Sequence, residues 1–246
     1  MTLPTFYWLP KLHKNPYKSR FISNSSHCST TILSKHITSA LTAVKDHVVK
    51  YCEIAFTNSN VNYFWSIKNS GDVIEKLKLR NFKGSQVSSF DFSTLYTSLP
   101  HNLIKEKLLS LVNWCFNRQS KTYLCTSERS GFFSNKKYDS YKCWTCTEFC
   151  EAFTFLMDNI YVQFGGKVFQ QIVGIPMGTN CAPLIADLFL YCYEKEFMSN
   201  LHKSKRLDLV DMFNDTSRYL DDILSIDNPE YEKHNSRHKF IRLNSS

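Results

Sequence analysis

The sequence predicts an α+β fold, because stretches with helical spacing and stretches typical of strands follow one another without an internal repeat. The chain has 246 residues, of which 43% are apolar and 21% are charged, a composition typical of a globular protein. Its seven glycines and seven prolines exclude collagen-like and low-complexity chains. No stretch rich in Gly, Ser or Pro divides the sequence, so we expect one interlocked unit.

Apolar residues recur at helical spacing in three ranges, 30–52, 73–79 and 103–116. The range 184–193 is apolar nearly all round. This pattern predicts a buried helix that begins shortly after Gly178 and has a proline in its first turn.

Strand-like runs lie between these helices. Residues 86–92 form a short apolar run that ends near an acid, and residues 218–226 are apolar on both sides of two acids. Residues 161–164 and 167–173 flank two glycines, which predicts a β-hairpin. Residues 117–143 contain few aliphatic side chains and several basic ones, which indicates a polar insertion or a long loop.

The positive charge is concentrated at one end of the chain. The net charge is +8, and residues 1–50 carry seven Lys and Arg against Asp46 alone, so that they account for +6 of it. The same segment interleaves aromatic and hydrogen-bonding side chains, a mixture suited to phosphates and bases. Nucleic acid or a polyphosphate is therefore the expected partner, and a solvated basic face without function is the alternative.

The sequence predicts neither a membrane span nor a secretory signal. The longest mainly apolar stretch, 181–193, contains Asp187 and is too short to cross a bilayer, and residues 1–14 lack a basic segment followed by an apolar core. We therefore expect an intracellular protein. Its nine cysteines favour reduced thiols, and the spacing of Cys143, Cys146 and Cys150 leaves open a zinc site or thiols that face a core.

Three acids point to a metal site. Asp221 and Asp222 are adjacent within an apolar strand pattern, where their repulsion and desolvation need a compensating cation. Asp91 ends another apolar run, and it would meet Asp221 if the two strands pair in one antiparallel sheet. Carboxylates of this kind suit Mg²⁺, with Mn²⁺ as a substitute, and an exposed Asp-rich turn is the alternative interpretation.

Two further motifs accompany the acids. Gly174 and Gly178 allow the backbone of 173–183 to approach a ligand closely, and a tight strand-to-helix turn is the alternative. The segment 9–14 followed by Arg20 supplies cations suited to a triphosphate.

These four motifs, in this order, resemble the reverse transcriptase fold. The resemblance is closest to the RNA-directed DNA polymerases of Penelope-like retroelements, which are relatives of telomerase reverse transcriptase, and it covers about residues 5–234. Residues 219–222 resemble the Tyr-x-Asp-Asp box and residues 90–96 resemble the first metal-binding motif. Residues 170–183 are similar to the segment that packs against the incoming nucleotide, and residues 9–14 with 19–23 are similar to the fingers element that grips the triphosphate.

The resemblance implies roles for individual residues. Catalysis and the binding of Mg²⁺ fall to Asp91, Asp221 and Asp222. Tyr96 occupies the position at which the family rejects a ribose 2′-hydroxyl. The nucleotide-binding residues it implies are Lys11, Arg20, Phe92, Tyr96, Gly174, Pro176, Met177 and Gly178, and those that contact nucleic acid are Lys14 and Tyr219.

The resemblance also implies a right-hand polymerase with a palm and fingers but without a thumb, because only 24 residues follow Asp222. Residues 231–246 then form a truncated tail. The ranges 1–85 and 118–171 form the fingers, and the ranges 86–117 and 172–230 form the palm. One departure from the family is Phe21, which follows Arg20 where the family usually has a proline.

The implied activity is RNA-directed DNA synthesis with an RNA template, a DNA primer and deoxynucleoside triphosphates, in the nucleus if the element inserts there. Two alternatives remain open. The chain is either a catalytically inactive remnant that binds nucleic acid, or an RNA-templated RNA polymerase, since polymerase classes share the metal-binding acids. Tyr96 at the expected sugar gate argues against the RNA polymerase. The oligomeric state stays undetermined.

Overall fold

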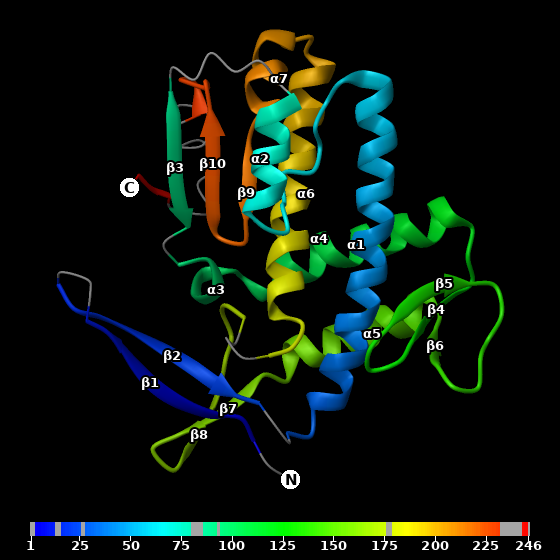
Figure 1. Cartoon of the computed structure of the whole chain (residues 1–246). Coiled ribbons are helices and arrows are strands. Elements are labelled where there is room, and N and C mark those ends of the chain that lie inside the picture. The colour runs from blue at the N-terminus through cyan, green and yellow to red at the C-terminus, as the bar shows by residue number, and fades with distance from the viewer. Residues whose placement is uncertain are drawn as a thin grey trace. The chain divides into compact units, whose positions relative to one another are not determined.

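A computed structural model describes most of the chain (Figure 1). The described residues are 3–12, 16–25, 28–79, 86–92, 94–175, 179–231 and 243–245. They form two compact units, each built from two segments: residues 1–47 with 96–185, and residues 48–95 with 186–246. Helices and strands alternate in both units, so the predicted α+β class is confirmed.

The first unit contains a four-stranded sheet with the strand order β2-β1-β7-β8. Its strands are β1 (Thr5–Lys11), β2 (Lys18–Asn24), β7 (Tyr161–Phe164) and β8 (Lys167–Gln170). The predicted hairpin is confirmed: β7 and β8 pair antiparallel around Gly165 and Gly166, whose φ angles of 57° and 76° are readily adopted only by glycine.

Helices complete the first unit. They are α3 (Leu95–Ser98), α4 (His101–Gln119), α5 (Cys146–Asp158), and the first parts of α1 (Thr31–Ser59) and α6 (Ala182–Lys203), both of which continue into the second unit. The helical spacing at 30–52 and 103–116 therefore predicted α1 and α4 correctly. A capping box between Thr145 and Glu148 fixes the start of α5.

Of the two expectations for 117–143, a polar insertion or a long loop, the long loop is wrong. This range forms most of a three-stranded sheet, with the order β5-β4-β6. Its strands are β4 (Tyr123–Thr126), β5 (Gly131–Ser134) and β6 (Lys142–Trp144).

Contacts with α1 and α4 explain why this sheet forms with so few aliphatic side chains. A Cβ atom at Gly131 would lie 2.3 Å from the backbone oxygen of Ser39, so the strand lies directly against the helix. Thr126 Oγ1 is 3.0 Å from His36 Nδ1, and Phe133 packs edge-on against Phe116 at 5.1 Å. Aromatic packing and a close backbone approach replace aliphatic burial here, and the local sequence pattern does not reveal either of them.

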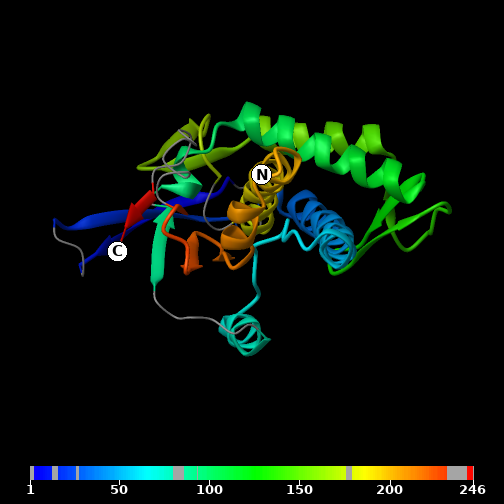
Figure 2. The ribbon, with the colours of Figure 1, turned by 90° about the horizontal axis from the view of Figure 1, so that it is seen from above.

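The second unit contains a sheet with the order β11-β3-β10-β9. Its strands are β3 (Val87–Phe92), β9 (Ser217–Tyr219), β10 (Asp222–Ile226) and β11 (Leu243–Ser245). Its helices include α2 (Ser70–Leu79) and α7 (Leu207–Asn214). Figure 2 shows α2 on one side of the sheet, with α6 and α7 on the other. Lys76 of α2 donates from Nζ to the backbone oxygen of Thr216 at 3.1 Å.

The helix predicted at 184–193 is confirmed as part of α6, which extends to Lys203. Leu188 and Tyr191 are fully buried, and the helix continues because Met198 and Leu201 are buried further along it. In the described part of the chain, no helix has both the length and the apolar composition needed to cross a membrane.

Candidate functional site

Asp91 and Asp222 face each other across two neighbouring strands. β3 and β10 pair antiparallel, with Asp222 opposite Asp91 and Ile223 opposite Phe90. Phe90 and Ile223 are buried, and side chains alternate between the faces of a sheet, so both acids lie on the opposite, more exposed face. The expectation that the two strands pair is confirmed.

The register differs from the expectation in one respect. Asp222, and not Asp221, is the direct partner of Asp91, because Asp222 also pairs with Tyr219 and leaves Leu220 and Asp221 as a two-residue turn. We refer to Leu220 and Asp221 as the hairpin turn. The backbone N–H of Phe92 donates to the backbone oxygen of Asp221 at 3.1 Å, which ties the hairpin turn to β3.

The three acids interact electrostatically. Burial, followed by the charges of Asp221 and Asp91, raises the pKa of Asp222. Like charges that face each other across strands are destabilising. The cluster therefore concentrates negative charge that a cation would relieve, although no three Asp, Glu, His or Cys side chains within the described ranges form a ready-made metal site.

Replacing Asp222 with Asn is expected to stabilise the metal-free protein by about 0.2–0.5 kcal/mol, the lower part of the range for facing like charges, because Asp222 is exposed. The folded protein holds the Asp222 proton more tightly than the unfolded chain. The free energy of unfolding therefore falls as the pH rises from the ordinary aspartate pKa of about 3.9 through the raised value. Urea unfolding across this pH range should show that Asp222→Asn removes the fall.

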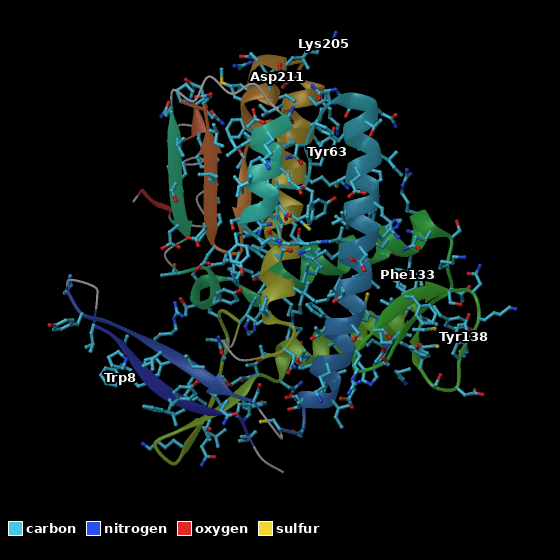
Figure 3. All side chains as sticks on the ribbon, viewed as in Figure 1. Trp8, Tyr63, Phe133, Tyr138, Lys205 and Asp211 are labelled. Carbon is cyan, nitrogen blue, oxygen red and sulfur yellow. The ribbon has the colours of Figure 1, made fainter. Side chains whose placement is uncertain are left out.

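Asp211→Asn serves as the matched control, because Asp211 is an exposed acid on α7 in the same unit (Figure 3). Added Mg²⁺ should raise the melting temperature of the wild type and of the Asp211 variant, since a ligand that binds only the folded state stabilises it. An equal Mg²⁺ effect on the Asp222 variant would contradict a metal site at this acid.

The expected sugar gate and the expected nucleotide loop meet within the first unit. The backbone N–H of Ile175 donates to the Tyr96 oxygen at 2.7 Å, and that of Gly174 donates to the Leu99 oxygen at 2.8 Å. Gly174 has a φ angle of 82°, and a Cβ atom there would lie 2.5 Å from the Tyr96 oxygen. His101 Nε2 lies 2.6 Å from the Gly174 oxygen. The tight turn at this glycine therefore brings the loop against the half-buried Tyr96.

The remaining predicted residues are placed unevenly. Arg20 is exposed on β2, opposite Leu9 of β1, and Tyr219 is exposed on β9. Phe92 places its ring in the core, and it is the Phe92 backbone that reaches the hairpin turn. Four predicted residues (Lys14, Pro176, Met177 and Gly178) and the side chain of Lys11 lie outside the described residues.

The β1–β2 hairpin presents aromatic rings to solvent. Tyr7, Trp8 and Phe21 are 48%, 57% and 44% exposed, and Figure 3 shows Trp8 on this hairpin. Next to it an open groove of about 930 Å³ is lined by Tyr7, Asn24 and Lys35, among others. Exposed rings beside hydrogen-bonding and basic side chains suit stacking and phosphate contacts with a nucleic acid.

Two residues near these sites were missed from the sequence. His101 contacts the Gly174 oxygen, but it lies outside every motif that the sequence analysis identified. Arg218 is wholly buried and pairs with Asp187 and Glu194, although a single basic residue in a strand gives no local signal of burial. The nine cysteines are free thiols, so the cysteine spacing does not reflect a disulfide framework.

The chain has a polymerase-like fold, as its similarity to solved structures shows. The telomerase of Candida albicans, solved with a fragment of telomeric RNA, matches with a TM-score of 0.60 and 14% sequence identity over 100% of this chain. The telomerase of Candida tropicalis, also solved with such a fragment, matches with a TM-score of 0.60 and 12% identity over 99% of this chain. An RNA polymerase complex inside a double-stranded RNA virus matches with a TM-score of 0.50 and 13% sequence identity over 100% of this chain.

The chain spans only part of these proteins: 43% and 40% of the two telomerase chains, and 20% of the viral chain. At such low identity the likeness concerns the fold alone. No protein-family model matches the sequence, and no curated protein matches it either.

Proposed function

We propose that the chain is the RNA-directed DNA polymerase domain of a Penelope-like retroelement. In RNA-directed DNA synthesis the 3′-hydroxyl of a DNA primer attacks the α-phosphorus of a deoxynucleoside triphosphate that is paired with an RNA template. The bond to the β-phosphate breaks and pyrophosphate leaves. The observation that carries the proposal is the placement of Asp91 opposite Asp222, with Asp221 in the adjoining turn. The polymerase-like fold supports it, and the telomeric RNA in the telomerase structures supports RNA as a partner.

The acids at the hairpin fit Mg²⁺, or Mn²⁺, as a resident ion. Their donors are carboxylate oxygens, which are hard ligands. Burial and the repulsion from Asp221 and Asp91 raise the pKa of Asp222, and a cation would relieve both. A bound pair of such ions would activate the primer hydroxyl and neutralise the leaving oxygen. Asp91 and Asp222 would hold the ion from neighbouring strands, and Asp221 would complete the donor set from the turn.

The other residues have supporting roles in this proposal. Arg20 and Lys11 bind the triphosphate, and Tyr96 excludes a ribose 2′-hydroxyl. Gly174 and the loop that follows it shape the nucleotide pocket. The sheet of the second unit corresponds to the palm and the β1–β2 hairpin to part of the fingers. An element that inserts into chromosomal DNA requires this activity in the nucleus.

Primer extension on an RNA template with Mg²⁺ tests the proposal. Asp221→Asn and Asp222→Asn are each expected to lower the rate about 100-fold or more. A bound metal ion stabilises the charge of the transition state by several kcal/mol, and about 1.4 kcal/mol corresponds to a tenfold change in rate. Asp211→Asn, the exposed acid on α7, should retain the wild-type rate. Extension by Asp221→Asn at near the wild-type rate would refute these roles.

A second candidate is a remnant that binds nucleic acid without catalysis. The exposed rings of Tyr7, Trp8 and Phe21 and the exposed Arg20 favour it, because they bind without need of the acids. Binding to single-stranded RNA that weakens with salt, in a protein that shows no Mg²⁺-dependent extension, would select this candidate.

A third candidate is an RNA-templated RNA polymerase, which the viral neighbour favours. Competition between ribonucleotides and deoxynucleotides decides between the two polymerases. With Tyr96 as the sugar gate, the wild type should prefer deoxynucleotides, and Tyr96→Ala should raise ribonucleotide incorporation. An unchanged sugar ratio in Tyr96→Ala would remove Tyr96 from this role.

A further inference from the structure

Arg218 is wholly buried, and all of its donors are used. Its five side-chain N–H groups meet five acceptors. Nε and Nη2 donate to the two carboxylate oxygens of Glu194, the latter at 3.3 Å, and Nη2 also donates to the backbone oxygen of Asp187 at 3.2 Å. Nη1 donates to Asp187 Oδ1 at 2.8 Å and to the backbone oxygen of Leu220 at 3.2 Å. The guanidinium therefore joins helix α6 to the hairpin turn.

The helix presents the two acids at the spacing this arrangement needs. Asp187 and Glu194 are seven residues apart on α6, which is two turns, so they share one face of the helix. Both are buried beside Arg218. Burial alone would lower the pKa of Arg218, but Glu194 and Asp187 raise it, so the guanidinium stays charged. Asp187 accepts a hydrogen bond from Nη1 and so orients the same nitrogen that donates to the Leu220 oxygen in the turn.

The hairpin turn needs an external restraint. Leu220 has a φ angle of 54°, in the left-handed region that costs an L-residue with a side chain about 1–2 kcal/mol. Strained backbone persists only where its surroundings hold it, and it concentrates at functional sites. Two hydrogen bonds hold two successive peptides of the turn: Arg218 donates to the Leu220 oxygen, which belongs to the central peptide, and the Phe92 N–H donates to the Asp221 oxygen, which belongs to the next one.

We propose that Arg218 is a positioning residue that fixes the hairpin turn on helix α6 and thereby sets Asp221 and Asp222 against Asp91. The inference rests on the proposed function, in which these acids bind the metal. Arg218 does not touch the substrate. It acts through the Leu220 carbonyl, and Asp187 and Glu194 orient it.

The test replaces Arg218 with Lys, which keeps the charge but cannot present a planar fork to two carboxylates and a carbonyl at once. The first measurement is the affinity of the full chain for Mn²⁺, by electron paramagnetic resonance well below the unfolding temperature. The dissociation constant should rise about 10- to 100-fold, the usual effect of losing a residue that orients metal ligands. The second measurement is amide hydrogen exchange at residues 220–222, which should accelerate at least about tenfold in the metal-free protein.

Asn214→Ala is the control for a loss of stability alone. Asn214 is buried in the same unit, and its side chain accepts from the Asn62 backbone at 2.7 Å and donates to the Asn60 oxygen at 2.8 Å. These hydrogen bonds are made to Asn60 and Asn62, and neither of them is made to the hairpin turn or to the Arg218 side chain. The variant should therefore lower the melting temperature and leave both the Mn²⁺ affinity and the exchange at the turn unchanged.

A second variant avoids leaving buried acids without their cation, so that a loss of Mn²⁺ binding cannot be due to unfolding. Replacing Arg218 with Met, Asp187 with Leu and Glu194 with Met takes out all three charges, an exchange that often preserves or improves stability. This folded variant should still show the 10- to 100-fold weaker Mn²⁺ binding.

The outcomes separate the inference from the proposed function. Wild-type Mn²⁺ affinity together with unchanged exchange at the turn, in either Arg218 variant, overturns the inference. A wild-type chain that binds no Mn²⁺, or binds it without extending primers, counts against the proposed function. The exchange at residues 220–222 still decides in that case whether Arg218 holds the turn.

Discussion

The single substitution Arg218→Met should lower the free energy of unfolding by about 3–5 kcal/mol, the usual cost of removing one partner from a buried ion pair. Asp187 and Glu194 would remain buried without their cation, and the Leu220 oxygen would lose its donor. Methionine fills much of the volume of the arginine side chain. The loss of unfolding free energy therefore arises more from the missing charge than from a cavity. Urea unfolding of the wild type and the variant measures it.

Arg206→Met is the matched control for this substitution. Arg206 also pairs with a carboxylate, Asp208, through Nε and Nη2 at 3.3 and 3.2 Å, but both side chains are more than half exposed. Exposed pairs of this kind add little to stability. Similar losses for the two Arg-to-Met variants would show that burial does not govern the Arg218 network.

The substitution Gly174→Ala should lower the free energy of unfolding by about 3 kcal/mol. Roughly 1–2 kcal/mol arises from placing a side chain at a φ angle of 82°. A further 1–3 kcal/mol, roughly, arises from overlap of the new Cβ with the Tyr96 oxygen, 2.5 Å away, because backbone atoms cannot move aside cheaply. The turn that joins residues 173–175 to Tyr96 should open, and chemical denaturation would measure the loss of stability.

Gly166→Ala separates the two causes. Gly166 has a similar φ angle of 76°, but no atom of the described residues comes within 4 Å of the position that its Cβ would occupy. The Gly166→Ala variant should therefore lose only the part of the unfolding free energy that comes from the positive φ angle, about 1 kcal/mol. Equal losses at Gly166 and Gly174 would mean that the close approach to Tyr96 contributes nothing.

The sequence predicts those parts of the site that depend on local pattern. Apolar residues around Asp91 and around Asp221 and Asp222 are enough to predict strands there, and the structure confirms that the strands carrying Asp91 and Asp222 pair. The partner of Asp91 depends on which residues the turn uses. Because a shift of one residue changes every pair, this register could not be read from either strand alone.

Features held by distant contacts escaped prediction. The β5-β4-β6 sheet depends on α1, which lies about 90 residues earlier and supplies His36 against Thr126 and the backbone against Gly131. Arg218 looks like a solvent-facing residue until Asp187 and Glu194, on another element, are known to face it. In both cases the stabilising partner is remote, and no window of sequence contains it.

Full use of the five donors of Arg218 also constrains how the chain can change over evolutionary time. A mutation at position 218 alone leaves two buried acids without their cation. A mutation at 187 or 194 alone removes one of the two carboxylates that pair with the buried Arg218. The three positions should therefore vary as a linked set among descendants of this sequence, switching together between a charged and an apolar combination. A lineage that keeps the arginine but discards both acids would have to supply new carboxylates from elsewhere in the unit.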